Sequence, residues 1–319
     1  MLRYTLRRLL WMIPIVLGVA ILVFTLMTFC PGDPAQIILG SSATADEIAA
    51  MRETLGLNQP FIVRLGRFLS DTFIHFDLGR SWMNDTSVGA AIAVRLPRTL
   101  VLAIVTLLLS AAVGIPLGVI AAVHQGGFGD NLSMVLALIG ISIPSFWLAM
   151  LLVLLFSVKL NWLPAMGIGG LKYYILPAIA GSTGGIATLA RQTRSSMLDV
   201  IRSDYITTAR SKGVPENKVI TKHALKNALI PIITVIGNQF GHLVGGMMII
   251  ETIFSIPGMG TLIVQGVNQR DYPVVQAGAI FLAIAFSLIM LVVDLLYAAA
   301  DPRIKARYSA QGKKVKKHA

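Results

Sequence analysis

The chain is a succession of long apolar runs separated by shorter polar stretches. A helix needs about 20 apolar residues to cross about 30 Å of hydrocarbon. Six runs approach or exceed this length, at residues 9–29, 99–123, 133–158, 175–190, 230–253 and 275–299. Glycines and small polar residues dilute the fourth run, but such residues also let helices pack closely in a membrane. The pattern predicts an all-α, polytopic membrane protein with six transmembrane helices.

The polar stretches divide the chain into four parts. Residues 1–30 hold the first transmembrane helix, and residues 31–96 form a small extracytoplasmic segment with expected helices at 45–55 and 61–73. Residues 97–300 form a five-helix core, and residues 301–319 a basic tail. The core contains a long charged loop at 191–229 and outer loops at 159–174 and 255–273. Because the last loop is rich in Gly and Pro, we expect it to be turn-rich and to line a vestibule.

The first apolar run is too long for a cleavable signal peptide. It has 21 residues and no small-residue cleavage pattern after it. Cys30 follows the run, but Met27, Thr28 and Phe29 are too bulky for a lipoprotein processing site. A lone cysteine forms no disulfide framework, so we interpret Cys30 as a structural residue at a helix end.

Composition supports the membrane class. The chain is 55% hydrophobic and 13% charged, with a mean hydropathy of +0.75, whereas soluble domains carry about a quarter charged residues. The net charge of +12 does not indicate nucleic acid, because 18 of the 27 Lys and Arg fall in three segments that one topology places in the cytoplasm. Both termini are therefore expected on the cytoplasmic side. The terminal "KKVKK" is expected to touch anionic lipid or to remain in solution.

Catalytic and phosphate-binding motifs are absent from the sequence. It contains neither the GxxxxGK[ST] loop that cradles ATP phosphates nor an HExxH zinc motif, and its five His are scattered. We therefore expect no catalytic residue, metal or cofactor on this chain. Ionisable residues in the runs are few, chiefly Asp294 in the sixth and Glu251 at the outer end of the fifth. An ion-driven carrier usually shows more buried acids, so a stand-alone secondary transporter remains an alternative and a membrane enzyme a distant third.

The loop between the fourth and fifth runs reads as helix, turn, helix. Ser203 is a suitable N-cap, Asp204 falls in the first turn, and Arg210 and Lys212 fall in the last, which is the charge order that a helix dipole favours. Gly213 is placed for the left-handed position after the helix. Pro215 then suits the first position of a second helix, with Glu216 in its first turn.

Two interpretations of this segment remain open from the residues alone. A short capped helix about 15 Å long could dock end-on into a partner. An amphipathic loop could instead lie on the membrane surface, helped by its basic residues. The face formed by Tyr205, Ile206, Ala209 and Gly213 lacks the large apolar anchors of surface helices.

The same segment resembles the cytoplasmic signature loop of ABC-importer permeases, in the form found in the dipeptide/oligopeptide/nickel family. That pattern places EAA, three residues, then Gly, and here Thr207, Thr208 and Ala209 precede Gly213 at that spacing. The Glu is replaced by Thr207, and the later proline is Pro231, which are departures typical of this family branch. Further stretches resemble the family over nearly the whole chain: "RRLLWMIPIVLGVAILVFTLMTFCPGDP", "LGLNQPFIVRLGRFL", "FDLGRSW", "ETIFSIPGMGTLI", "RDYPVVQ" and "DLLYAAADPRIKAR".

The resemblance implies a pore subunit of a bacterial inner-membrane importer. Its partners would be a second, homologous permease chain in a heterodimer, two ATPase subunits that bind ATP and Mg²⁺, and an extracytoplasmic solute-binding protein. The short helix would sit in a groove of one ATPase and couple ATPase closure to alternating access. The residues expected at this contact are Tyr205, Thr208, Ala209, Arg210, Lys212, Gly213, Pro215 and Glu216, with Ala209 facing the ATPase.

Three further expectations concern the spans and the cargo. Glu251, Pro257 and Gly258 are candidates for the pore or outer gate, and Asp294 for a structural hydrogen bond near the inner surface. The resemblance favours di- or oligopeptides as substrates, with nickel chelates, glutathione or other small solutes as alternatives.

Overall fold

The computed structural model describes residues 2–300, and the predicted basic tail at 301–319 lies outside them. The regular secondary structure of the described chain is helical, apart from one isolated β-bridge between Arg80 and Ser87. It divides into two compact units. One combines residues 100–255 with 288–300 and the start of the chain up to Arg8, and the other combines residues 9–99 with 256–287.

Sixteen helical elements follow one another along the described residues. They are α1 (Leu2–Phe29), α2 (Pro34–Leu39), α3 (Ala45–Thr54), α4 (Phe61–Phe73), α5 (Val88–Val123), α6 (Phe128–Ser142), α7 (Ser145–Leu152), the π-helical η1 (Val153–Lys159), α8 (Lys172–Ile201), α9 (Asp204–Ser211), α10 (Glu216–Lys218), the π-helical η2 (Val219–Ala224), α11 (Leu225–Gly246), α12 (Met248–Ile253), α13 (Met259–Gln269) and α14 (Tyr272–Ala300).

Four helices of the described chain are long and apolar enough to cross a membrane. They span Thr5–Phe29, Val88–Val123, Glu216–Gly246 and Tyr272–Leu295, and a bent pair at Phe128–Ser142 and Ser145–Lys159 makes a fifth span if it crosses as one. The run predicted at 175–190 lies inside the long helix α8, which does not meet the same apolar criterion. The predicted count of six therefore stays a prediction.

The third predicted span is not one continuous helix. The chain bends by 93° between α6 and α7, at Ile143 and Pro144. Proline disfavours the helical conformation of the residue before it, and Ile143 accordingly is extended, with φ −81° and ψ 120°. The uninterrupted apolar character of residues 133–158 hid this break, which is a correction to the sequence interpretation.

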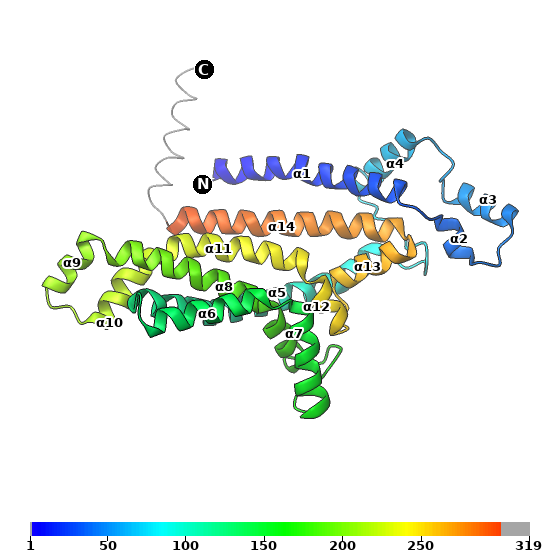
Figure 1. Cartoon of the computed structure of the whole chain (residues 1–319). Coiled ribbons are helices and arrows are strands. Elements are labelled where there is room, and N and C mark those ends of the chain that lie inside the picture. The colour runs from blue at the N-terminus through cyan, green and yellow to red at the C-terminus, as the bar shows by residue number, and fades with distance from the viewer. Residues whose placement is uncertain (1, 301–319) are drawn as a thin grey trace, which may run out of the picture. The chain divides into compact units, whose positions relative to one another are not determined.

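Helix α8 is the centre of the first unit. It contacts α6, α7 and α11, and Figure 1 shows α6, α8 and α11 side by side. Glycines bring backbones together here, because a Cβ added at Gly118 of α5 would stand 2.5 Å from the carbonyl oxygen of Ala190. A Cβ at Gly185 would stand 1.9 Å from the Gln239 amide nitrogen. In the predicted fourth run, Gly185 thus leaves room for side chains of neighbouring helices, whereas Gly184 has no heavy atom within 4 Å of a Cβ position.

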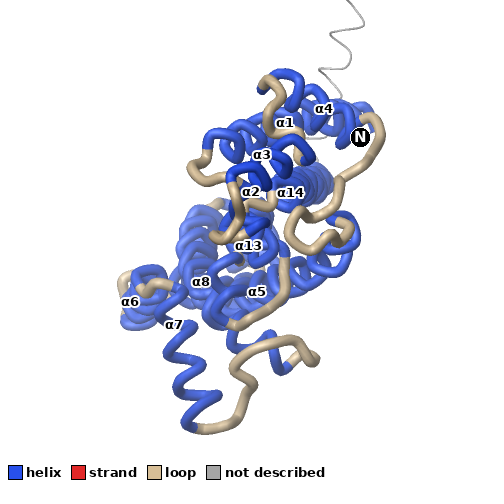
Figure 2. The backbone as a smooth tube through the Cα atoms, turned by 90° about the vertical axis from the view of Figure 1, so that its right-hand side faces the viewer, coloured by secondary structure: helices blue, strands red, loops and turns tan. Residues whose placement is uncertain are grey.

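The segment after α1 is ordered into short helices, as predicted. Figure 2 shows α2, α3 and α4 as helices joined by loops. A capping box starts α3, in which Thr44 and Glu47 bond each other's backbone N–H, and this bonding lowers the pKa of Glu47 from its usual value. Helix α4 begins and ends where the sequence predicted, and α3 ends one residue earlier, at Thr54.

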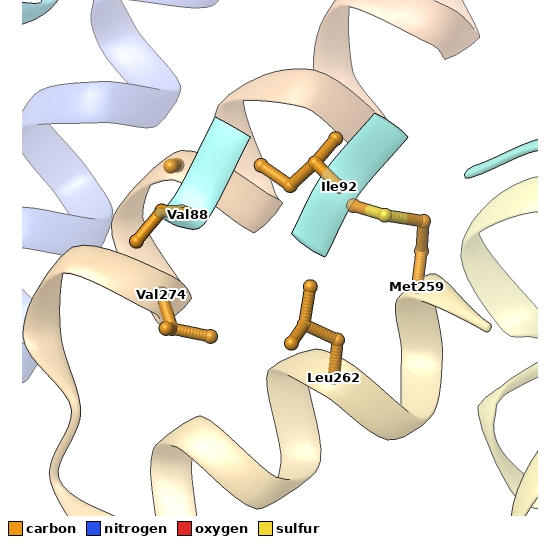
Figure 3. Packing of buried hydrophobic residues seen from close by; sticks show 6 residues of the cluster. Val88, Ile92, Met259, Leu262 and Val274 are labelled. Carbon is orange, nitrogen blue, oxygen red and sulfur yellow. The ribbon is translucent and has the colours of Figure 1, made fainter. Parts of the chain in front are cut away.

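The start of α5 and the segment before α14 share an apolar core within the second unit. Val88 and Ile92 of α5 pack with Met259 and Leu262 of α13 and Val274 of α14 (Figure 3). The stretch predicted as a turn-rich loop at 255–273 is therefore largely helix. Its first residues, "SIPG", and Arg270 and Asp271 before α14 lie outside helix, and the residues between them place apolar side chains at helical spacing.

Candidate functional site

The charged loop between α8 and α11 forms a helix, a turn and a second helix, as predicted. Ser203 occupies the N-cap of α9 with an extended backbone, and its carbonyl oxygen accepts the N–H of Ile206 at 3.0 Å. The Ser203 hydroxyl does not cap the helix, however, because it donates to the carbonyl of Val200 at 2.6 Å. It thereby ties the start of α9 to the end of α8.

The turn after α9 depends on Gly213. Its φ is +74°, which is the predicted left-handed conformation, and its N–H donates to the Arg210 carbonyl at 2.9 Å. No heavy atom lies within 4 Å of where a Cβ would stand, so the backbone conformation and not space selects glycine. Pro215, predicted as the first residue of the second helix, is instead the N-cap of α10, which begins one position later at Glu216.

One face of α9 is fastened to the protein's own core. Ile206 is fully buried in a cluster with Met197 of α8 and Val219 of η2, and Ala209 and Val214 pack against the same cluster. Ala209 is therefore half-buried and directed inward. Ala209 thus helps to pack α9 onto its base, and its predicted contact with a partner stays a prediction.

The opposite face of α9 is polar and exposed. Its exposed residues are Asp204, Tyr205, Thr207, Thr208, Arg210 and Ser211. The hydroxyls of Thr208 and Ser211 donate to carbonyls one turn earlier, at 2.9 and 3.0 Å. The hydrogen-bonding capacity of these two hydroxyls is therefore partly used within the helix.

Two side-chain contacts fix α9 against the helices that follow, α10 and α11. The Tyr205 hydroxyl accepts from the Asn227 amide of α11 at 3.1 Å. The Arg210 guanidinium donates to both Glu216 oxygens, at 2.6 and 3.1 Å, and this bonding raises the pKa of Arg210. Sequence reasoning assigned Tyr205, Arg210 and Glu216 to the site without foreseeing these contacts. Lys212 is exposed and is the C-cap of α9.

A buried ion pair lies at the base of this helical segment, and sequence reasoning missed it. Asp130, at the start of α6, is 3% exposed and accepts two bonds from Arg194 of α8 at 2.6 and 2.7 Å, and one from the Gly126 N–H at 2.9 Å. Arg202, at the end of α8, donates to Gln125 at 3.0 Å. The α5–α6 turn is thus bonded twice to the part of α8 that carries α9. The sequence signal for this ion pair was the position of Asp130, an acid that comes shortly before an apolar run.

The remaining predicted residues do not form one cluster. Glu251 is fully buried in α12. Pro257 accepts a bond from Arg98 at 3.4 Å, and the N–H of Gly258 donates to Thr261 at 3.0 Å at the start of α13. These contacts stabilise the turn into α13.

Asp294 forms an ion pair in the first unit. One of its carboxylate oxygens lies 2.9 Å from an Arg8 guanidinium nitrogen, so it bridges α14 and α1. Arg8 is therefore the candidate partner for the structural role expected of Asp294. Across residues 2–300, no group of three or more His, Cys, Asp or Glu side chains is arranged to hold a metal ion.

Comparisons with known proteins cover both parts of the chain. Residues 114–306 match the family described as "Binding-protein-dependent transport system inner membrane component", and residues 1–103 match the corresponding N-terminal family of membrane components. A putative peptide transport system permease protein of Brucella abortus is 47% identical over 308 residues, which cover 94% of this chain and 98% of that protein. A glutathione transport system permease protein of Salmonella paratyphi A is 45% identical over 305 residues, covering 96% and 99%.

Among solved structures, the methionine ABC transporter MetNI in an inward-facing conformation resembles this chain. The TM-score is 0.56 at 19% identity, and the match covers 66% of this chain and 96% of the other. At that identity the likeness concerns the fold alone. It agrees with a permease fold built from packed membrane helices.

Proposed function

Because this chain belongs to the family of binding-protein-dependent transport system inner membrane components, and is a permease subunit of an ABC importer, we propose that it couples ATP hydrolysis to transport through α9. The observation that carries the proposal is the two-sided geometry of α9. One face is buried in the chain's own core and the other is exposed and mostly polar, with Tyr205 as its one large ring. A helix held in this way suits a lever that a partner can push.

The contacts of α9 support a rigid lever. Ile206 anchors it to α8 and η2, while Tyr205 and Arg210 bond residues of the following helices. A displacement of α9 is therefore expected to move η2 and α11 with it. In this proposal the exposed residues Asp204, Tyr205, Thr207, Thr208 and Lys212 contact an ATPase subunit, and Gly213 sets the angle of the turn.

The surface-helix alternative has weaker support. Ile206, the largest aliphatic side chain of α9, is fully buried in the protein, so it is not available to anchor the helix in lipid. The exposed side chains of α9 are mostly hydroxyl or charged. This distribution favours a protein partner over a membrane surface.

The assembly that we propose has four further components. A second permease chain completes the pore, two ATPase subunits bind ATP and Mg²⁺ on the cytoplasmic side, and a solute-binding protein docks on the outer segment at 31–96. Both chain termini lie in the cytoplasm in this arrangement, which follows the distribution of Lys and Arg. The pore or gate roles of Glu251, Pro257 and Gly258 remain part of this proposal.

Peptides are the cargo that we propose first. The two relatives are named for peptide and glutathione transport, and glutathione is itself a small peptide. A pathway lined by apolar and small side chains suits solutes of variable sequence. Nickel chelates and other small solutes are the alternatives.

Reconstitution into liposomes tests the proposal. The permease pair, its ATPases and the binding protein should take up labelled di- or oligopeptides only when ATP is supplied, and removal of the ATPases should abolish uptake. Uptake by this chain alone, driven by an ion gradient and indifferent to ATP, would instead establish a secondary carrier.

A further inference from the structure

Two neighbouring residues, Arg270 and Asp271, contact both ends of the outer segment within the second unit. They lie in the turn between α13 and α14. Arg270 contacts Cys30 and Pro31, where the segment leaves α1, and Asp271 contacts Ser81 and Trp82, shortly before it joins α5. Segments far apart in sequence are therefore held by a single turn.

Asp271 is a buried acceptor. It is 2% exposed, and its carboxylate accepts the hydroxyl proton of Ser81 and, at 3.1 Å, the backbone N–H of Trp82. Its own N–H donates to the Gly266 carbonyl at 2.9 Å. Burying a carboxylate is costly unless donors satisfy it, so the chain around Ser81 and the carboxylate of Asp271 each depend on the other's position.

Arg270 has an uncommon backbone conformation. Its φ is +57°, in the left-handed region that non-glycine residues seldom adopt. The guanidinium lies 2.8 Å from the Cys30 sulfur and also donates to the Pro31 carbonyl. A Cβ added at Gly32 would stand 3.1 Å from the Arg270 side chain, so the backbone after Cys30 closes directly on it. These contacts hold the strained residue in place.

The turn is also locked to α14. The rings of Trp82 and Tyr272 lie 5.0 Å apart, and Tyr272 and Val275 share an apolar cluster with Met27 of α1. A Cβ at Gly266 of α13 would stand 2.9 Å from Val275, so α13 and α14 are in close contact. The first turn of α14 is thus unable to move independently of the residues that hold the outer segment.

We propose that Arg270 and Asp271 are positioning residues that form a clamp, which makes the outer segment a rigid extension of α14. A protein that docks on the segment then displaces α14 directly, and not only the ends of α1 and α5 to which the segment is covalently joined. This inference rests on the proposed docking of a solute-binding protein at the segment. The clamp transmits docking and does not itself contact the docked protein or the cargo.

The test uses the complete importer in liposomes and measures ATP hydrolysis against the concentration of loaded binding protein. In Asp271→Ala the maximal stimulation should fall by about fivefold or more, which is the range of a lost coupling energy. The concentration for half-maximal stimulation and the basal hydrolysis per assembled complex should stay close to those of the wild type. Ser81→Ala should fall in between, and Asp271→Asn, which keeps the shape and one acceptor, should retain most of the stimulation.

Cys30, the single cysteine of the chain, gives a readout independent of docking and ATP hydrolysis. Release of the segment in Asp271→Ala should increase the rate of Cys30 alkylation by a water-soluble maleimide several-fold, with Arg270 left in place so that the charge beside the sulfur is unchanged. Wild-type protein and Asp271→Asn are the controls.

The outcomes separate the two hypotheses. Full stimulation in Asp271→Ala and Ser81→Ala, or a change only in the half-maximal concentration, would overturn the clamp as a transmitting element. Unchanged Cys30 labelling would overturn it as a mechanical tie. A wild-type complex that the binding protein does not stimulate would contradict the proposed function, while faster Cys30 labelling in Asp271→Ala would still support the clamp.

Discussion

Gly213 is the residue on which the geometry of the lever depends most directly. Its φ of +74° is poorly tolerated by a β-branched side chain, so Gly213→Val should cost about 1–2 kcal/mol locally. Membrane insertion and pairing with the second permease should survive, whereas ATP-driven uptake should be largely lost. Gly213→Asn is the matched control, since Asn enters the left-handed region more readily. Normal uptake by Gly213→Val would remove the turn from the mechanism.

Ala209 and Thr208 are neighbours with opposite surroundings, and they separate packing from docking. Ala209→Asp places a carboxylate against the cluster around Ile206, so α9 should detach, at a cost of about 2 kcal/mol or more. Trypsin should then cut faster at Arg210 and Lys212. Thr208→Asp should leave cleavage unchanged and weaken ATPase co-purification. Equal cleavage of the two variants would contradict the assignment of inner and outer faces.

The sequence could predict the left-handed glycine but not the direction of Ala209. Gly213 is identified by local signals, a basic last turn before it and Pro215 after it. The facing of Ala209 depends on Met197 and Val219, which lie on other elements and pack against α9 only after folding. An eight-residue helix with few apolar side chains has too little periodicity to reveal its buried face.

The tie between α6 and α8 should show an asymmetry that follows from burial. The side chain of Asp130 is 4% exposed and that of Arg194 is 29% exposed. Arg194→Met leaves a buried carboxylate with one backbone donor, and should cost about 3 kcal/mol, whereas Asp130→Asn leaves a guanidinium that water can reach and should cost less. Thermal unfolding of the purified complex measures both. A larger loss in Asp130→Asn would be inconsistent with this account.

At the scale of elements, the sequence predicted which helices form better than it predicted where a helix is interrupted. The short helices at 45–54 and 61–73 and the α9 turn have clear caps or periodicity and were found as expected. The break at Pro144 was hidden because the residues on both sides are equally apolar. Helix α13 was missed because the Gly and Pro before it dominate the local signal, although its Leu262 and Met259 pack into a core.

For the whole molecule, the distribution of basic residues predicts that two solvent-exposed positions lie on opposite sides of the membrane. Glu53→Cys in α3 and Ser211→Cys in α9, each in a Cys30→Ser background, should differ in labelling by an impermeant maleimide in intact cells. Glu53→Cys should react from outside, and Ser211→Cys only after the cytoplasmic face is opened. The reverse pattern would invert the topology and place α9 away from any ATPase.

The family of the whole chain was accessible from its sequence, but the contacts that hold the segment at 31–96 were not. Motif stretches spread along the chain identified the permease family. "RDYPVVQ" was among them, yet its local sequence does not reveal that Asp271 is bonded to Ser81 and Trp82, which precede it by about 190 positions. Long-range polar contacts of this kind depend on how the elements pack, and they produce no periodic pattern in the sequence.

The central claim is that the exposed face of α9 meets an ATPase subunit, and crosslinking tests it most directly. A photo-crosslinking amino acid at Thr208 should capture an ATPase subunit in the assembled importer, and the yield should change when ATP closes the ATPase pair. The same group at Glu53, on an exposed part of α3, should capture no ATPase. The account is contradicted if an importer that is active in uptake gives no ATPase crosslink from Thr208.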